Sequence, residues 1–66
     1  MAKLDKEVAK VKRAIRMLQD AQLEIYEASA SLQSMGYKES AQMAEAVFTK
    51  VESAESAAVD LWRKLQ

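Results

Sequence analysis

The chain has 66 residues, with ten basic and ten acidic side chains, one Gly and no His, Cys or Pro. This length suits one small domain, so we expect residues 1–66 to form a single unit. Without His or Cys, the sequence offers no thiolate metal site, disulfide, cysteine nucleophile or imidazole base.

A first helix is predicted over about residues 3–35, because apolar residues recur alternately four and three positions apart. This spacing is typical of a coiled coil and not of a strand. Gln22 and Ser29 fall on the apolar seam, where they either set the register of helix pairing or lie at its edge beside water. The seam consists of Leu4, Val8, Val11, Ile15, Leu18, Ile25 and Leu32, flanked at seven-residue intervals by Ala14, Ala21, Ala28 and Met35.

Gly36 is the only helix breaker in the chain and marks the turn. Gly suits the left-handed position just past a helix end, and in a Schellman motif Tyr37 would pack back onto Leu32. Small residues gather on both sides of this turn, which either lets two helices approach closely or forms a groove or polar pocket. They are Ala28, Ser29, Ala30, Ser31 and Ser34 before the turn, and Ser40, Ala41, Ala44 and Ala46 after it.

A second helix is predicted over about residues 38–65, since its apolar period continues without a break. The short connection at Gly36 requires the two helices to lie antiparallel. The predicted fold is therefore all-α, an antiparallel two-helix hairpin. Its second seam consists of Ala44, Val47, Val51, Ala54, Ala58, Leu61 and Leu65, widened by Ala41, Phe48 and Trp62.

The segment Met35-Gly36-Tyr37, followed by an Ala-rich helix, resembles the loop of ubiquitin-associated domains. That family has a second loop before its last helix, whereas residues 49–53 here continue the apolar period. In hairpin length and turn position alone, the chain is similar to dimeric RNA-binding plasmid regulators and to small co-chaperones of type III secretion. No motif supports these resemblances, so no residue role is carried over.

Self-association is expected because the chain has few large apolar side chains. There are twenty when Ala and Met1 are not counted. So small a core leaves a lone hairpin marginally stable, and a homodimeric four-helix bundle is the simplest remedy. The residues expected at the self-association interface are Val8, Val11, Ile15, Leu18, Val47, Phe48, Val51, Leu61 and Trp62.

The charges balance only as a sum. Residues 1–16 carry a net charge of +4, residues 17–59 carry −5, and residues 60–66 carry +1. Folding at Gly36 brings the two basic segments together, which leaves a hairpin with +5 at its open end and −5 toward its turn. Two hairpins with their turns at opposite ends would place each basic end beside an acidic one, so electrostatics favour this antiparallel dimer.

Catalysis is not expected. Two Glu-x-x-Glu pairs occur, Glu24/Glu27 and Glu52/Glu55, but the His that accompanies such pairs in dinuclear sites is missing. We interpret these carboxylates as exposed and solubilising, and we predict no catalytic residue, cofactor or metal. No apolar run has the length of a membrane span, and a cytoplasmic protein without membrane contact is expected.

The leading hypothesis is a self-associating hairpin that acts in protein–protein interaction, as an adaptor, co-chaperone or regulatory subunit. Its partners would be a second copy and a heterologous protein. The alternative is an RNA- or DNA-binding regulator that uses a basic stripe on the first helix. The stripe consists of Lys3, Lys6, Lys10, Arg13 and Arg16, but the aromatic residues do not alternate with it as a base-stacking platform would.

Overall fold

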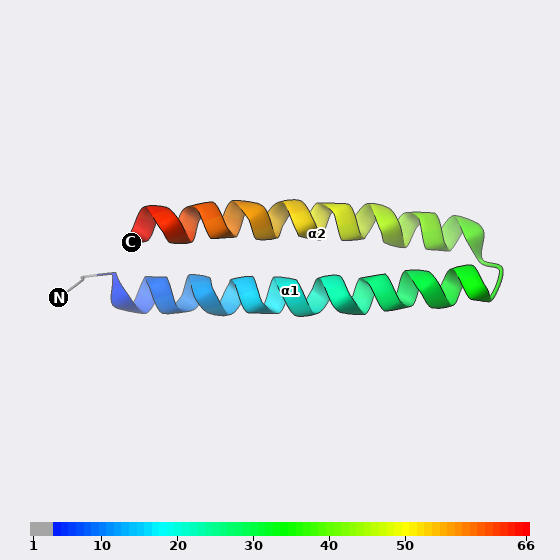
Figure 1. The fold of residues 1–66 in the computed structure, drawn as a ribbon, viewed down its shortest axis with the longest axis horizontal. Helices are drawn as coiled ribbons and strands as arrows, with labels where there is room; N and C mark the ends of the chain where they lie inside the picture. The colour runs from blue at the N-terminus through cyan, green and yellow to red at the C-terminus, as the bar shows by residue number, and fades with distance from the viewer. Residues whose placement is uncertain (1–3) are drawn as a thin grey trace.

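The computed structural model describes residues 4–66, which form two long antiparallel helices joined by a short turn (Figure 1). Helix α1 spans Asp5–Ser34 and helix α2 spans Lys38–Leu65. The predicted all-α hairpin is confirmed, and α2 runs unbroken through residues 49–53, where a ubiquitin-associated domain has a loop. Lys3, which belongs to the predicted basic stripe, lies outside the described residues.

The hairpin is a rod of 54 × 14 × 10 Å with a radius of gyration of 15.3 Å. A compact domain of this chain length would have a radius of gyration of about 11 Å. The described residues supply no third element against the outer faces of the two helices (Figure 1). Each helix therefore packs on one side only.

The turn is a Schellman motif, as the sequence predicts. The backbone N–H of Tyr37 donates to the Leu32 carbonyl at 2.9 Å, and that of Gly36 donates to Gln33 at 3.1 Å. Gly36 has a φ of 89°, which lies in the left-handed region that only Gly enters without strain. These two bonds satisfy carbonyls that the end of α1 would otherwise leave unpaired.

Charged residues at the helix ends complement the helix dipoles. Asp5 and Glu7 lie in the first turn of α1, and Glu39 lies in the first turn of α2. Arg63 and Lys64 lie in the last turn of α2. Neither N-cap residue makes a side-chain capping bond, so the acidic residues of the first turns support the helix starts, while the last turn of α1 contains no basic residue.

The helices meet along one seam of part-buried and buried residues, which we call the helix seam. On α1 it follows the predicted period, although Leu4 at the start is 42% exposed. The α1 members are Val8, Val11, Ile15, Leu18, Gln22, Ile25, Ser29 and Leu32. The α2 members are Ala41, Ala44, Phe48, Val51, Glu55, Ala58, Trp62 and Leu65.

The seam of α2 is rotated by one residue from the prediction. Three residues predicted to lie on it are exposed: Val47, Ala54 and Leu61. The residues that directly follow them, Phe48, Glu55 and Trp62, take their places. Aromatic rings bury more apolar surface than Val or Leu, and Glu55 finds hydrogen-bond donors across the seam that offset the desolvation of its carboxylate.

The core of the hairpin is thin. Among the described residues only Ala41, at 0% exposure, and Ser29, at 7%, are buried. No large side chain is fully buried, and the part-buried residues of the helix seam stay open to solvent at their edges. In the described part of the chain, neither helix has a stretch long and apolar enough to cross a membrane.

Replacing Gly36 by Ala should lower the free energy of unfolding by about 1–2 kcal/mol, because a Cβ strains a left-handed backbone. An added Cβ would meet no atom within 4 Å, so the strain comes from φ alone. Urea unfolding followed by far-UV circular dichroism, at one fixed protein concentration, measures the change. Ser34→Ala, in the last turn of α1, is the control and should leave stability equal or slightly higher. An unchanged unfolding midpoint for Gly36→Ala would contradict this account of the turn.

Candidate functional site

A polar cluster lies at the middle of the helix seam, where Glu55 of α2 faces two amides of α1. Gln19 donates through Nε2 to Glu55 Oε2 at 2.9 Å, and Gln22 donates through Nε2 to Glu55 Oε1. Each carboxylate oxygen thus has its own donor, and the pair of bonds joins the helices at a single level. This cluster favours one register of α1 against α2, since sliding either helix by one turn would leave the carboxylate with only one of its two amide donors.

Glu55 is a residue that the sequence analysis misplaced, because we interpreted it as an exposed solubilising carboxylate. It is part-buried, whereas Glu24, Glu27 and Glu52 are exposed. The hydrogen bonds from Gln22 and Gln19 hold the pKa of the Glu55 carboxyl below its ordinary value, against a smaller opposing effect of burial. Its spacing of seven residues from Phe48 and from Trp62 is the signal that would have placed it on the seam.

Ser29 resolves one of the alternatives left open by the sequence. Its hydroxyl is buried and donates to the carbonyl of Ala41 across the seam at 3.4 Å. So long a bond is weak, but it places a backbone carbonyl of α2 beside α1. Both Gln22 and Ser29 therefore bind across the seam. The small residues let the helices approach closely at Ser29 and Ala41, and Ser29 and Ala30 also line a hollow beside the seam.

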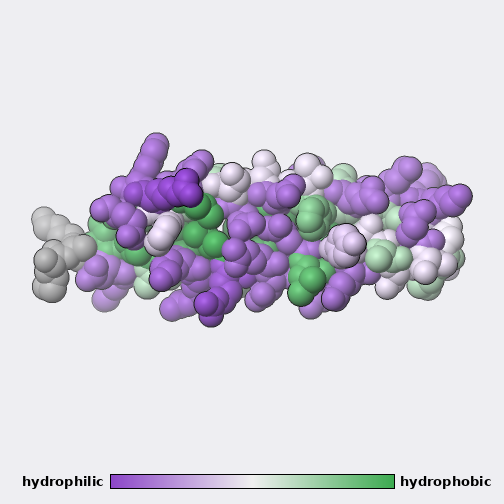
Figure 2. Space-filling view, viewed as in Figure 1, coloured by the Kyte–Doolittle hydropathy of each residue, from purple (hydrophilic) through white to green (hydrophobic). Residues whose placement is uncertain are grey.

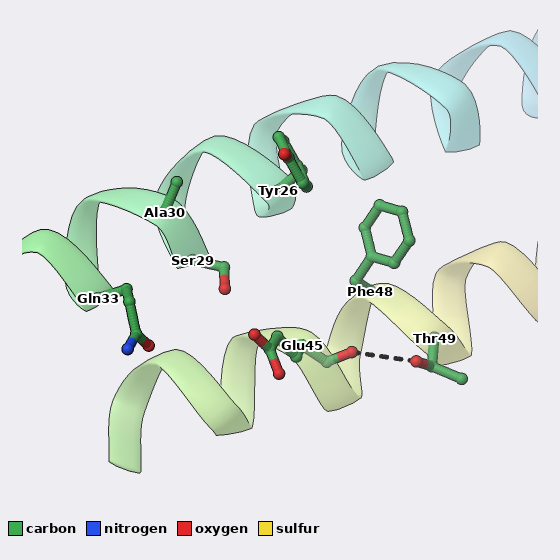
Figure 3. A pocket seen from close by; sticks show the side chains of 7 residues that line it. All are labelled: Tyr26, Ser29, Ala30, Gln33, Glu45, Phe48 and Thr49. Atoms are coloured by element: carbon green, nitrogen blue, oxygen red, sulfur yellow. Dashed lines mark hydrogen bonds between the residues drawn. The ribbon is translucent and has the colours of Figure 1, made fainter. Parts of the chain in front are cut away.

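A hollow of about 420 Å³ lies beside the seam in the half nearer the turn (Figure 3). The rings of Tyr26 and Phe48 form one wall, with centroids 6.4 Å apart and planes inclined by 57°. Thr49 donates to the Glu45 carbonyl of its own helix at 3.1 Å, so its hydroxyl proton is engaged within α2. The full lining is Tyr26, Ser29, Ala30, Gln33, Glu45, Phe48 and Thr49.

A second hollow, of about 240 Å³, lies toward the end that carries the termini. Its walls combine apolar residues with two cations, and they consist of Lys12, Ile15, Arg16, Gln19, Val59 and Trp62. The indole Nε1 of Trp62 is buried and has no acceptor among the described residues. Figure 2 shows one side of the rod, on which hydrophobic residues reach the surface between the helices toward the same end.

Both hollows open on the same side of the hairpin, which we call the hollowed face. On each helix, the hollows are lined by residues that come four positions after a residue of the helix seam. Gln19, for example, comes four positions after Ile15 on α1, and Val59 is its counterpart on α2. The residue directly before such a seam residue lies on the other flank of the seam, so these residues share the opposite side of the hairpin. We call the seven apolar residues on this side the alanine face: Ala14, Ala21, Ala28 and Met35 on α1, and Val47, Ala54 and Leu61 on α2. Glu7 and Ser40 continue the two rows at the starts of α1 and α2.

The alanine face is apolar and open to solvent. Ala21 is part-buried, and its other six members are exposed. Met35, Val47 and Leu61 are 66%, 46% and 48% exposed. Two further exposed methionines, Met17 and Met43, lie beyond it on the outer surfaces of the helices.

The residues predicted for self-association fall into two groups. Val47 and Leu61 lie on the alanine face and are exposed. The other seven, Val8, Val11, Ile15, Leu18, Phe48, Val51 and Trp62, are part-buried in the seam between α1 and α2 of the same chain. These seven side chains thus lie partly against the other helix of the same chain, and Ala14, Ala21, Ala28 and Ala54 are further surface residues beside them.

The basic stripe is exposed along its described length. Lys6, Lys10, Arg13 and Arg16 are all exposed, and Arg16 also lines the hollow beside Trp62.

Residues 4–66 bring together no group of three or more Asp or Glu residues placed to hold a metal ion. Comparison with protein-family models, with curated proteins and with solved structures finds no match.

Acidification should destabilise the hairpin partly through Glu55. Because its folded-state pKa lies below the ordinary value of 4.5, its contribution is complete above that pH and is lost as the pH falls through the folded-state pKa. The thermal midpoint should therefore fall more from neutral to strongly acidic pH in the wild type than in Glu55→Gln. Glu52→Gln, exposed and one turn away, is the matched control and should follow the wild type. Equal falls in wild type and Glu55→Gln would show that the cluster adds no pH-dependent stability.

Proposed function

We propose that the chain is a non-enzymatic, self-associating hairpin that acts in protein–protein interaction, with a homodimeric four-helix bundle as its working form. The observation that carries this proposal is the absence of any fully buried large side chain in the described residues. A folded protein needs a buried apolar core to offset the conformational entropy that folding removes. A second layer against the open side of the hairpin supplies that core.

The accessible surface supports the same proposal. The hairpin exposes 5409 Å², whereas a compact monomer of 7.4 kDa exposes about 4,200 Å². The excess is about 1,200 Å² per chain, and two chains that covered it would bury about 2,400 Å² together, within the range of obligate homodimers.

A dimer of this kind fits an adaptor, co-chaperone or regulatory subunit better than a catalyst. The two hollows are shallow grooves along a rod. After one side is covered by a second copy, the other side remains for a heterologous protein. We propose protein partners on this basis.

Sedimentation equilibrium at micromolar concentration tests self-association. The expected result is a folded species of twice the 7.4 kDa chain mass, with helical circular dichroism measured on the same sample. A folded species of single chain mass across the concentration range would refute the proposal. The mass is measured at low and high salt, so that charge-driven aggregation is distinguished from burial of apolar surface.

RNA or DNA binding is the second candidate, favoured by the exposure of Lys6, Lys10, Arg13 and Arg16 along α1. It predicts retardation of an RNA hairpin or a DNA duplex at low salt, with affinity that falls steeply as salt rises. The double variant Lys10→Glu, Arg13→Glu should abolish the shift. The control is Lys38→Glu, Lys50→Glu, which makes the same charge change on α2 and should retain it. No retardation by the wild type at low salt removes this candidate.

A further inference from the structure

We infer that the alanine face is the surface on which the second copy docks, turned end for end, so that α1 lies against α1 of the partner and α2 against its α2. This inference rests on the proposed self-association and adds to it which surface is used and in which orientation. Three independent features carry it: the distribution of charge between the two faces, the small size of the side chains, and the charge asymmetry along the rod.

The first feature is the absence of charge at the centre of the alanine face. Its seven members, from Ala14 to Met35 on α1 and from Val47 to Leu61 on α2, are uncharged, and the rows that contain them have one charged residue, Glu7 at the start of α1. On the hollowed face the corresponding positions, four after a seam residue, include Lys12, Glu45 and Glu52. Burying unpaired charges is costly, and the centres of interfaces are depleted in them. The alanine face is therefore the side that a second copy covers at lower desolvation cost.

The second feature is side-chain size. Ala14, Ala21 and Ala28 are spaced seven residues apart, so a row of methyl groups runs along α1 beside the seam. Such a row allows the backbone of another helix to approach closely. Val47 and Leu61 supply the larger apolar groups on α2, and both are about half exposed, at 46% and 48%. Their burial adds hydrophobic stabilisation that the isolated hairpin lacks.

The third feature is the charge asymmetry, which selects the orientation. The end with the termini carries a net charge of +5 and the rest of the rod carries −5. Turning the second copy end for end places each basic end beside an acidic half, whereas placing both turns together gathers the like charges. Surface charges are individually weak, but the net charges of the two parts of each chain differ by ten elementary charges.

Symmetry then determines which residues meet. In a face-to-face dimer with turns at opposite ends, the two-fold axis lies in the interface and crosses the rod at its middle. Helix α1 then faces α1 of the second copy, and α2 faces its α2. Ala21 lies midway along α1, next to Gln22 of the central cluster, and Ala54 lies next to Glu55. Each of these two alanines therefore faces the same residue of the second copy. Ala14 and Ala28, at equal distances on either side, face each other across the interface.

Disulfide cross-linking tests this arrangement directly, because the chain has no cysteine of its own. A disulfide forms only where two Cα atoms come within about 7 Å. Under mild oxidation, Ala21→Cys alone and Ala54→Cys alone should each form a covalent dimer on a non-reducing gel. Ala14→Cys and Ala28→Cys should stay monomeric alone and cross-link when mixed. Leu23→Cys, exposed on the far side of α1, is the control and should not cross-link.

The outcomes separate this inference from the proposed function. A covalent dimer that forms only from mixed Ala21→Cys and Ala54→Cys would mean that the turns lie together, because that orientation places α1 against α2 of the second copy. No cross-link from any alanine-face variant, while sedimentation shows a dimer, would place the interface elsewhere and leave self-association standing. A wild-type monomer in sedimentation would overturn both.

A charge scan checks the same face without oxidation. Leu61→Glu, on the alanine face, should raise the dimer dissociation constant at least about tenfold, since it buries an unpaired carboxylate. Leu23→Glu makes the same change at a comparably exposed leucine, 58% against 48%, and should leave dissociation unchanged. Because both leucines lie outside the helix seam, neither change disturbs the packing of α1 on α2. Equal effects of the two variants would overturn the assignment of the face.

Discussion

A pair of helices can bury only one stripe of each helix, and the rest of this structure depends on that constraint. The seam between α1 and α2 covers one side of each helix, and the described residues provide nothing for the other sides. Within residues 4–66 only Ala41 and Ser29 are buried, and both are small. The hairpin thus has a defined shape but little core, and we propose that association supplies the stability that it lacks.

The polar cluster at the centre of the seam makes the apolar core of the hairpin smaller still. Glu55 with Gln19 and Gln22 occupies a level that large apolar side chains would otherwise fill. Hydrogen bonds between charged and amide groups favour one register, because a pairing shifted by one turn leaves the carboxylate with one amide donor instead of two. They contribute less than the burial of a well-packed apolar layer of the same size. The hairpin gains a specific alignment at its middle, and its alanine face is presented as one continuous surface.

The fold was largely predictable from the sequence, and the candidate surface was not. A single Gly in an otherwise unbroken apolar period leaves the position of the turn almost no freedom, and the Schellman bonds at Tyr37 and Gly36 follow from it. The seam of α2 was ambiguous, because Ala44, Val51 and Ala58 belong to either of two adjacent stripes. Apolar spacing favours the stripe with Val47 and Leu61, since the other contains Glu55. Only the two amides that α1 brings to Glu55 show why the carboxylate side is used. The other stripe of α2, with Val47, Ala54 and Leu61, stays exposed and becomes part of the alanine face.

The dependence of stability on protein concentration tests most directly whether folding and association are coupled. Thermal unfolding followed by far-UV circular dichroism, over a hundredfold range of concentration, measures it. If the second copy supplies the missing core, the midpoint rises steadily with concentration, and helicity is lost on dilution. A midpoint that stays constant over the whole range, with helicity retained at the lowest concentration, would show that the hairpin is stable alone and would contradict the account.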